Sequence, residues 1–380
     1  MPDFYTRERK RFNLFYETHW RPPQLGALTA ALSHWTLEPR EPALVSIPTG
    51  AGKTAIAMAT PYVIPKPPRR ILVVAPSADL RTQLSDKFVS EHDLAVVSAL
   101  AGKPDQQLKV MRMTTRIKSW SNLEEFDVVI ALPNTISPRY YPGNLPPADL
   151  FDLVIIDEAH HASADTWHEI LHHFKDAYSL LLTATPIRRD GKRIPGKLVY
   201  YYPMRLALEA GFYKPIVPRI LTPTFPGDRD ATDRQIAETC ANIISQEEHS
   251  TSTLVVRANS IDRAESLTSL YKEMGIHLTP LHSRCGPRQR EEIVNRLKDG
   301  SLRGAAVVGM LGEGFDLGSI RILAYHDKHK SLPATIQLFG RLARTDPNFP
   351  QSSILVTARD ADIYPELQYI VRQLYAEDQD

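Results

Sequence analysis

The sequence is poor in cysteine and in excess charge, and it has no long apolar run. Its 380 residues include only 2 cysteines, which excludes a disulfide scaffold or a four-cysteine zinc site and favours the cytoplasm. The formal net charge of +1 excludes nucleic-acid binding by bulk charge alone. The longest apolar runs fall far below the roughly 18 residues of a membrane span. Residues 1–11 are polar and basic, unlike a signal peptide. We therefore expect a cytoplasmic globular protein that does not bind a membrane.

Short apolar runs alternate with longer amphipathic stretches along the whole chain. This pattern predicts an α/β fold in which helices cover mostly parallel sheets. The runs are rich in Val, Ile and Leu and do not alternate with polar residues, which suits strands buried on both faces. The first set of predicted strands is Ala43–Ile47, Arg70–Ala75, Asp127–Ala131, Leu153–Ile156 and Leu180–Leu182. The second set is Thr253–Arg257, His277–Leu281, Ala305–Val308, Ile320–Ala324 and Ser353–Val356.

A proline-rich segment separates the two sets of strands. Because proline removes a backbone donor and fixes φ, this segment is a poor helix or central strand and a good connector. We therefore predict a first domain over residues 1–210, a linker over 211–232 and a second domain over 233–380. The prolines of this segment are Pro203, Pro215, Pro218, Pro223 and Pro226.

A glycine-rich loop follows the first predicted strand and precedes a helix-like stretch. Its sequence is Ile-Pro-Thr-Gly-Ala-Gly-Lys-Thr over residues 47–54. Glycines allow backbone N–H groups to curl around a phosphate, and a helix N-terminus adds a positive dipole. Lys53 would reach the β- and γ-phosphates of a nucleotide, and the Thr54 hydroxyl would bind Mg²⁺. Ile47 stands where the pattern has a glycine, so a plain strand-to-helix turn is the alternative. The backbone of Thr49, Gly50, Ala51 and Gly52 would form the cradle.

Two carboxylates follow the predicted strand Leu153–Ile156. Asp157 and Glu158 emerge together at the carboxyl end of this apolar strand, where α/β sheets bind ligands. Asp157 would hold Mg²⁺, and Glu158 would polarise an attacking water as general base. The alternative, an ordinary acidic turn, is disfavoured because the glycine-rich loop lies on another strand of the same sheet.

Residues 157–160, Asp-Glu-Ala-His, resemble the metal motif of superfamily 2 helicases and translocases of the DEAH-box type. Other blocks of that family follow in family order between about residues 20 and 345. In the first half, 21–24 resembles the adenine-reading Q motif, 75–83 motif Ia, 132–135 motif Ib more loosely, and 182–186 motif III. In the second half, 254–257 with 264–267 resembles motif IV, 309–316 motif V and 337–344 motif VI.

The resemblance implies two tandem RecA-like domains with Mg²⁺ and ATP in the cleft between them. Gln24 would then pair with the adenine and Asp316 would bind the ribose, while Arg21 and Gly314 would also belong to the nucleotide site. Arg341 and Arg344 would reach the γ-phosphate from the second domain, with Gln337 positioning water or phosphate. Without the resemblance, Arg341 and Arg344 could equally be a salt-bridged helix face. Residues that would couple the ATP site to nucleic acid are His160, Thr183 and Thr185.

Nucleic-acid contacts are expected at motifs Ia, Ib, IV and V, which hold the sugar-phosphate backbone in this family. A basic stretch, Lys103 to Lys118, either extends this track along phosphate or is a solvated helix face or loop. The candidates in the motifs and the segment after motif IV are Pro76, Ser77, Arg81, Asn134, Thr135, Arg257, His282 and Met310.

Details of the motifs resemble one branch of the superfamily. His160 and Thr183 differ from the RNA DEAD-box enzymes, which have Asp and Ser there. Residues 185–191 and 312–316 resemble repair translocases and restriction motor subunits, which mostly move along duplex DNA. We therefore expect an ATP-dependent DNA helicase or translocase that works with a protein partner supplying specificity or nuclease activity, in repair, restriction or antiphage defence.

Three alternative functions remain open in the sequence. An ATP-gated clamp would bind nucleic acid without moving along it, although Glu158, Arg341 and Arg344 favour turnover. An RNA helicase would use the same motifs but would act on RNA. A P-loop kinase or signalling ATPase is disfavoured because such proteins lack motifs IV to VI.

His168-Glu-Ile-Leu-His172 matches the zinc-protease pattern of two histidines one helical turn apart. A zinc site needs a third protein ligand, and no histidine or glutamate follows at the usual spacing. We therefore expect these histidines, with His161 and His173, on the surface of a helix that packs on the sheet.

Overall fold

The computed structural model forms two compact units, Met1–Tyr202 and Pro203–Asp380. It describes residues 3–159, 164–184, 194–309, 317–327, 338–340, 342–343, 345–346, 348–359, 364–365 and 367–368. Within these ranges, no helix has the length and apolar character needed to cross a bilayer.

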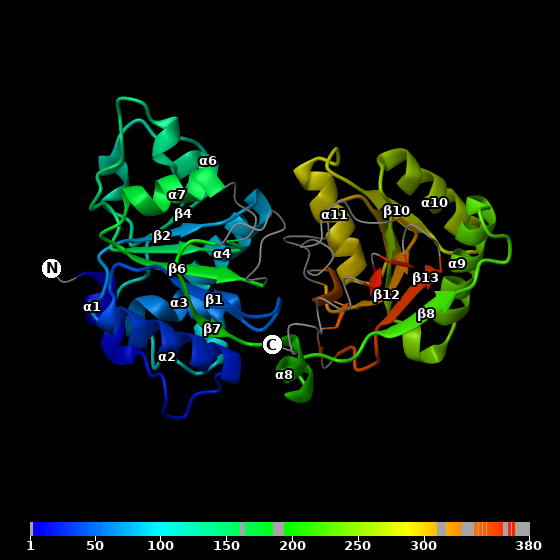
Figure 1. Cartoon of the computed structure of the whole chain (residues 1–380), viewed down its shortest axis with the longest axis horizontal. Coiled ribbons are helices and arrows are strands. Elements are labelled where there is room, and N and C mark those ends of the chain that lie inside the picture. The colour runs from blue at the N-terminus through cyan, green and yellow to red at the C-terminus, as the bar shows by residue number, and fades with distance from the viewer. Residues whose placement is uncertain are drawn as a thin grey trace. The chain divides into compact units, whose positions relative to one another are not determined.

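The first unit contains a parallel sheet with the strand order β3-β4-β2-β5-β6-β1-β7 (Figure 1). Its strands are β1 (Ala43–Ser46), β2 (Ile71–Val74), β3 (Val110–Arg112), β4 (Val128–Ala131), β5 (Leu153–Ile156), β6 (Tyr178–Thr183) and β7 (Lys197–Tyr201). Its helices are α1 (Phe4–Glu8), α2 (Pro22–Leu37), α3 (Lys53–Val63), α4 (Ala78–Ser90), α5 (His92–Val96), α6 (Pro133–Ile136) and α7 (Ala164–His173), with short 3₁₀ turns η1 (Arg9–Arg11), η2 (Trp120–Leu123) and η3 (Pro138–Tyr140).

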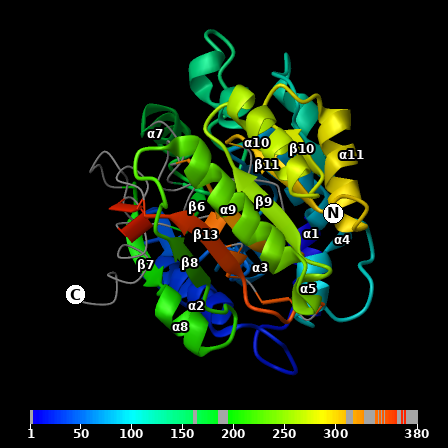
Figure 2. The ribbon, with the colours of Figure 1, turned by 90° about the vertical axis from the view of Figure 1, so that its right-hand side faces the viewer.

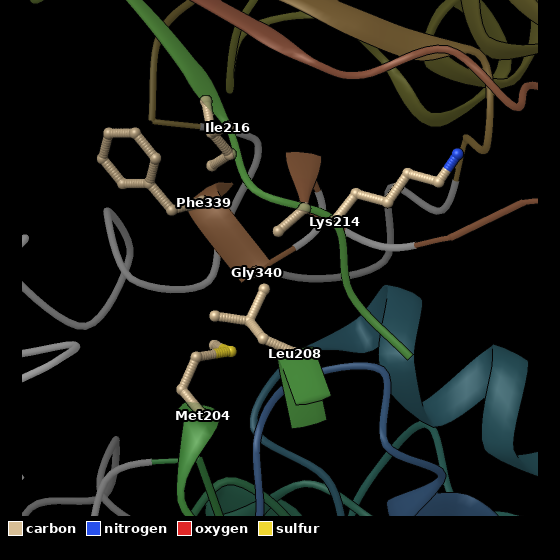
Figure 3. A pocket seen from close by; sticks show the side chains of 7 residues that line it. Met204, Leu208, Lys214, Ile216, Phe339 and Gly340 are labelled. Carbon is tan, nitrogen blue, oxygen red and sulfur yellow. The ribbon is translucent and has the colours of Figure 1, made fainter. Parts of the chain in front are cut away.

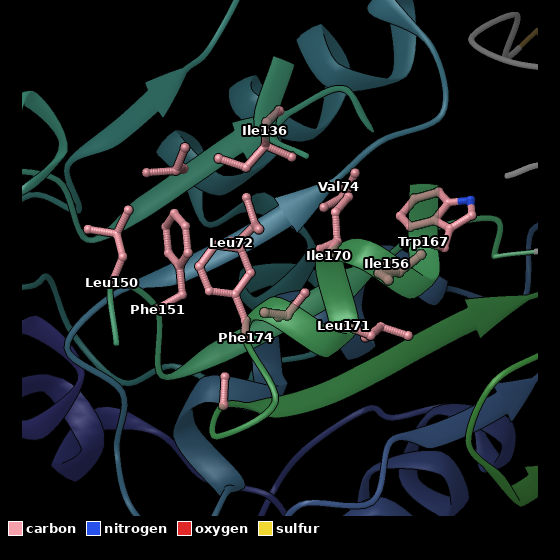
Figure 4. Close-up of a cluster of buried hydrophobic side chains, with 14 of the residues drawn as sticks. Leu72, Val74, Ile136, Leu150, Phe151, Ile156, Trp167, Ile170, Leu171 and Phe174 are labelled. Atoms are coloured by element: carbon pink, nitrogen blue, oxygen red, sulfur yellow. The ribbon is translucent and has the colours of Figure 1, made fainter. Parts of the chain in front are cut away.

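Helices cover both faces of this sheet, with α2 and α3 on one face and α6 and α7 on the other. Figure 4 shows how α7 packs, with Trp167, Ile170 and Phe174 directed at the sheet. These positions are three and four residues apart, so they share one helix face. Burying each such side chain contributes about 1.5–3 kcal/mol to folding.

The second unit contains a parallel sheet with the strand order β10-β11-β9-β12-β13-β8. Its strands are β8 (Val217–Leu221), β9 (Thr253–Arg257), β10 (Leu278–Leu281), β11 (Gly304–Val307), β12 (Ile320–Tyr325) and β13 (Ile354–Ala358). Its helices are α8 (Met204–Glu209), α9 (Arg229–Ile244), α10 (Ile261–Glu273) and α11 (Pro287–Lys298), with the 3₁₀ turn η4 (Glu247–His249).

The two faces of the second sheet bury different partners. On one face, α9 and α10 pack against alternate strand residues such as Ile322 and Ala324 (Figure 2). On the other face, α11 packs against Leu323 and Tyr325, together with Leu338, Phe339 and Leu342 of motif VI. Because side chains alternate along a strand, successive residues of β12 serve the two layers in turn.

All ten predicted strands are present, and the sequence missed β3, β7 and β8. All three missed strands lie at a sheet edge. An edge strand is partly exposed and needs no continuous apolar run, as in β8, whose three central residues are exposed and whose two end residues are partly buried. The predicted α/β fold with two mostly parallel sheets is confirmed.

The predicted linker, residues 211–232, is not a plain connector in the structure. It contains β8, which pairs in parallel with β13 at the edge of the second sheet, and also the start of α9. Pro218 is tolerated in β8 because an edge strand need not donate every backbone hydrogen bond. The segment is therefore partly built into the second unit, and the division between the units falls at Tyr202 and Pro203.

Candidate functional site: a phosphate cradle at the carboxyl edge of the first sheet

The candidate nucleotide residues meet at one edge of the first sheet. Strands β5, β6 and β1 are neighbours and run parallel, so their carboxyl ends lie side by side. The glycine-rich loop follows β1, Asp157 and Glu158 follow β5, and Thr183 ends β6. The predicted convergence of the loop and the two acids is therefore realised within the first unit.

The loop between β1 and α3 has the backbone of a phosphate cradle. Gly50 and Gly52 have φ angles of 89° and 99°, in the region that favours glycine. The Ala51 N–H donates to the Pro48 carbonyl, closing the turn, and α3 begins directly after Gly52 at Lys53. The N–H groups of the first turn of α3 thus start at the loop, where they favour an anion.

The start of α2 is bonded to this loop. Arg21 Nη1 donates to the Gly50 carbonyl over 3.0 Å. The buried Gln24 side chain accepts from the Arg21 N–H at 2.9 Å, and its Nε2 lies 3.4 Å from the Gly52 carbonyl. The two residues of the Q motif therefore contact the backbone of the glycine-rich loop itself.

Lys53 and Glu158 form a buried ion pair. Lys53 Nζ lies 2.5 Å from Glu158 Oε1, and both side chains are less than a tenth exposed. Glu158 has a φ of 50°, which is unusual for a residue with a side chain. The Asp157 carboxylate accepts from the Glu158 N–H at 3.0 Å and supports this turn. A phosphate binding at Lys53 would therefore compete with Glu158 for the ammonium group.

The oxygen donors expected for Mg²⁺ fit the ion. Asp157 and Thr54 are both partly accessible, at the end of β5 and the start of α3. A carboxylate and a hydroxyl beside the glycine-rich loop are the hard oxygen ligands that Mg²⁺ prefers.

Backbone hydrogen bonds tie motif III to the other two motifs. Thr183 is fully buried at the end of β6, and its carbonyl accepts from the Ile47 N–H at 3.0 Å. The neighbouring Leu182 carbonyl accepts from Ala159, one residue after Glu158. A displacement of the backbone at Thr183 would therefore move both the start of the glycine-rich loop and the chain that follows Glu158.

The motif Ia and Ib candidates divide into accessible and buried side chains. Pro76, Ser77 and Asn134 are at least partly accessible, and the Ser77 hydroxyl caps α4 by accepting from Leu80. Arg81 is instead buried, and its Nη1 donates to the Met113 carbonyl at 3.0 Å. The buried Thr135 hydroxyl bonds within the Leu132 turn. Both side chains thus bond to backbone carbonyls, and their contact with nucleic acid stays a prediction.

In the second unit, Arg257 is buried at the end of β9 and His282 is partly accessible after β10. The His282 ring lies 3.6 Å from the Cys285 sulfur. The other predicted site residues lie outside the described ranges; they are His160, Thr185, Met310, Gly314, Asp316, Gln337, Arg341 and Arg344.

The basic stretch is neither a helix nor a plain loop. Its centre is β3, the edge strand, where Arg112 is exposed. Arg116 follows β3, donates from Nε to the Asn134 carbonyl at 3.2 Å and lies over the Tyr140 ring. Arg116 therefore borders motif Ib, whereas Lys103 and Lys109 precede β3. The exposed basic residues of the stretch are Lys103, Lys109, Arg112, Arg116 and Lys118.

The histidines of the zinc-protease pattern lie on α7, where His168 and His172 are exposed, as expected. Glu169 accepts from the Ser137 hydroxyl, and His173 contacts the Pro146 carbonyl. No cluster of three or more His, Cys, Asp or Glu side chains suited to a metal ion occurs in the part of the chain that is described. His161 lies outside that part.

A small apolar pocket lies in the second unit beside Phe339 and Gly340 of motif VI (Figure 3). Ile216, Met204 and Leu208 supply most of its other walls, and the Lys214 ammonium points away from it to the Pro350 carbonyl. The lining offers few polar partners, so the pocket is unsuited to a nucleotide.

Sequence reasoning missed one polar cluster, at the carboxyl end of β12. His326 and Asp327 are almost fully buried and bonded to side chains of α9 and α10. The signal that identified Asp157 and Glu158, two polar residues directly after an apolar strand, was present here as well.

Comparison with known proteins supports the identity of both units. Residues 17–188 match the family described as type III restriction enzyme, res subunit, and residues 235–346 match the helicase conserved C-terminal domain. A protein of a Sulfolobus islandicus filamentous virus, named as a helicase, is 25% identical over 84% of this chain and 61% of its own length. The DNA 3'-5' translocase XPB2 of Sulfurisphaera tokodaii is 29% identical over 45% of this chain and 34% of its own length.

Solved structures agree on the fold. The type ISP restriction-modification enzyme LlaBIII bound to DNA aligns with a TM-score of 0.66 and 16% identity, over 94% of this chain and 29% of that one. Dbp5 of S. cerevisiae bound to RNA and ADP BeF3 aligns with a TM-score of 0.62 and 14% identity, over 94% and 92%. At such identities the likeness shows the fold alone. The two family matches and the repair-translocase relative place this chain among the superfamily 2 helicases, in the branch of restriction subunits and repair translocases, and the solved structures agree with its two RecA-like domains.

Proposed function

We propose that the chain is an ATP-dependent DNA translocase or helicase. The observation that carries this proposal is the buried Lys53–Glu158 pair, which joins the phosphate loop to the acid that follows β5. A second unit matching the helicase C-terminal domain makes a simple P-loop kinase a poor alternative. The relatives named for restriction and for DNA translocation favour DNA over RNA as the track.

In this proposal the residues of the first unit bind ATP and activate water. The loop N–H groups and Lys53 hold the phosphates, while Gln24 reads the adenine edge. Mg²⁺ held by Thr54 and Asp157 would supply charge neutralisation of the phosphates. Once Lys53 turns to the phosphate, Glu158 is released to accept a proton from the attacking water.

The second unit completes the site in this proposal. Arg341 and Arg344 supply positive charge to the γ-phosphate, where such arginines are worth about 10³–10⁵ in rate. Gln337 positions the water or the phosphate, Asp316 binds the ribose, and Gly314 contacts the nucleotide. His160, Thr183 and Thr185 carry the state of the phosphate to the nucleic-acid residues, which include Met310 and His282. Hydrolysis then requires both units. Each cycle of ATP hydrolysis is therefore linked to a change in how the protein binds the nucleic acid.

We further propose that the chain acts with a protein partner that supplies specificity or nuclease activity. The chain spans 61% and 34% of the two relatives described above, so those proteins carry sequence that this chain does not match. Contacts with the sugar-phosphate backbone do not read sequence, so the specificity would come from the partner.

Displacement of a DNA triplex separates movement from a static clamp. We expect the protein with ATP to displace a third strand from a linear duplex, because a translocase collides with it. Glu158→Gln should bind the same duplex and leave the triplex intact. If the wild type hydrolyses ATP on duplex DNA without displacing the third strand, the clamp is the correct description.

A further inference from the structure

Three exposed basic residues gather after the edge strand β3 of the first sheet. Arg112 ends this strand, and Arg116 and Lys118 follow it. In the part of the chain that the structure describes, no acidic side chain forms an ion pair with any of the three. We call Arg112, Arg116 and Lys118 the β3 basic cluster.

Two contacts orient the Arg116 side chain. Its Cζ atom lies 4.6 Å from the centroid of the Tyr140 ring, and its Nε donates to the Asn134 carbonyl at 3.2 Å. Among the described residues, the two terminal amino groups of this guanidinium have no hydrogen-bond partner. A planar guanidinium presents its N–H groups as a fork that matches the oxygens of a phosphate. Because the side chain is already oriented, binding a phosphate there costs less conformational entropy.

A buried arginine adds positive charge beside the cluster. Arg81 of α4 is only 8% exposed, and its Nη1 donates at 3.0 Å to the carbonyl of Met113, the residue after Arg112. Its Nε is buried and has no partner among the described atoms. Burial, and then the charge of Arg112, lower the pKa of Arg81, and no carboxylate offsets them. The two positive charges therefore repel each other, and an anion beside Arg112 would relieve this repulsion.

The cluster is separate from the phosphate cradle. β3 and β4 pair in parallel, so the carboxyl end of β3 lies at the same edge of the sheet as the glycine-rich loop. The strands β4, β2, β5 and β6 lie between β3 and β1. Since neighbouring strands are about 4.8 Å apart, the carboxyl ends of β3 and β1 are roughly 24 Å apart. An anion at the cluster is therefore a different one from the phosphates of a nucleotide in the cradle.

We infer that the β3 basic cluster binds backbone phosphates of the nucleic acid, with Arg116 as the oriented contact and Arg112 and Lys118 as charges beside it. This inference rests on the proposed function, because it names a nucleic-acid contact of the same motor. A nucleic acid fits better than an acidic protein surface because Arg116 is bonded to the backbone of Asn134, a motif Ib candidate for the same track.

The contact belongs to the first unit alone. The cluster, Arg81, Asn134 and Tyr140 all lie within Met1–Tyr202. Binding of phosphate at the cluster therefore needs no residue of the second unit. Its contribution to nucleic-acid affinity is the same whether or not a nucleotide is bound.

The test measures the dissociation constant, Kd, of the full-length protein for a fluorescently labelled linear duplex DNA over a range of salt concentrations. Arg116→Gln should raise Kd about tenfold, as expected for a lost hydrogen bond to a charged group. It should also lower the steepness of log Kd against log salt by about 0.9, the value for one phosphate contact. Arg116→Lys keeps the charge but not the fork, so it should keep the salt dependence and raise Kd by a smaller factor.

Arg112→Gln separates charge from structure. Among the described residues the Arg112 side chain makes no hydrogen bond, so its replacement removes positive charge without releasing the Asn134 carbonyl. This variant should raise Kd by a smaller factor than Arg116→Gln and should also reduce the salt dependence. Melting temperatures of all variants separate weaker binding from loss of folding.

A matched control lies at the other end of the same strand. Lys109 directly precedes β3, is exposed, and donates to Asp127 through its backbone N–H alone. Lys109→Gln removes the same unit of charge at the amino edge of the sheet. Its Kd should stay within about twofold of wild type, because exposed charges farther apart than about 10 Å are largely screened at 0.1 M salt.

The outcomes distinguish this inference from the function on which it rests. Weaker binding by Arg112→Gln and Arg116→Gln but not by Lys109→Gln supports it, provided that the factor is the same with and without a non-hydrolysable ATP analogue. Wild-type binding by both cluster variants, equal effects of all three substitutions, or a loss confined to one nucleotide state overturns it. If the wild type binds RNA but not DNA, the same criteria applied to RNA decide the inference, and only the DNA track of the proposed function fails. A wild type that binds no nucleic acid overturns the proposed function and the inference together.

Discussion

Replacing Glu158 by glutamine is expected to lower the rate of ATP hydrolysis by about 10²–10⁴ while ATP still binds. The amide keeps the shape of the side chain but cannot accept the proton of the attacking water. Lys53 also loses its charged partner at 2.5 Å, so the ammonium is free for phosphate and ATP affinity should stay equal or rise. Single-turnover hydrolysis and equilibrium binding of a fluorescent ATP analogue measure the two effects separately.

Glu169→Gln provides a control of equal chemistry. Glu169 lies on α7 of the same unit, and its side chain bonds to Ser137. Its replacement should leave turnover within about twofold of wild type, because surface substitutions away from the chemistry have small effects. Turnover by Glu158→Gln at the wild-type rate would mean that another group activates the water.

Gly52→Ala is the second substitution with a large expected effect. A Cβ at this position would lie 2.0 Å from Nε2 of the buried Gln24, and the backbone there has a φ of 99°. The loop and Gln24 must both move, and each distortion costs on the order of 1–3 kcal/mol. We expect ATP affinity to fall by about tenfold to a hundredfold, measured by titration calorimetry.

Gly143→Ala separates the two causes of this loss. Gly143 has a φ of 80°, but a Cβ there meets no atom within 4 Å. This variant should show the stability loss of a strained backbone without loss of ATP affinity. Equal ATP affinity in Gly52→Ala and the wild type would contradict the contact between the Q motif and the phosphate loop.

The sequence predicted the central strands but only one of the four edge strands, β10, and this has a physical reason. A strand buried on both faces must be continuously apolar, and runs such as Leu153–Ile156 are recognisable for that reason. The missed strand β3 is partly exposed and contains Arg112, so its composition resembles that of a loop. Only pairing with β4, a contact distant in sequence, makes it a strand.

The same limit applies to the site. The sequence predicted that Asp157 and Glu158 lie beside the phosphate loop, because the carboxyl ends of parallel strands meet at one edge of a sheet. Arg81 belongs to a motif whose family contacts nucleic acid, but its side chain turns inward to the Met113 carbonyl. A motif locates a loop, whereas the direction of a side chain depends on contacts that are distant in sequence.

A nucleic-acid motor is tested most directly by ATP hydrolysis of the purified protein without nucleic acid and with single-stranded DNA, duplex DNA or RNA. Glu158→Gln serves as the blank. We expect turnover that duplex DNA stimulates strongly and that the blank lacks. Stimulation by RNA alone would contradict the DNA track while keeping the ATP site. Turnover that no nucleic acid stimulates, or that the blank retains, would contradict a nucleic-acid motor built on the Lys53–Glu158 site.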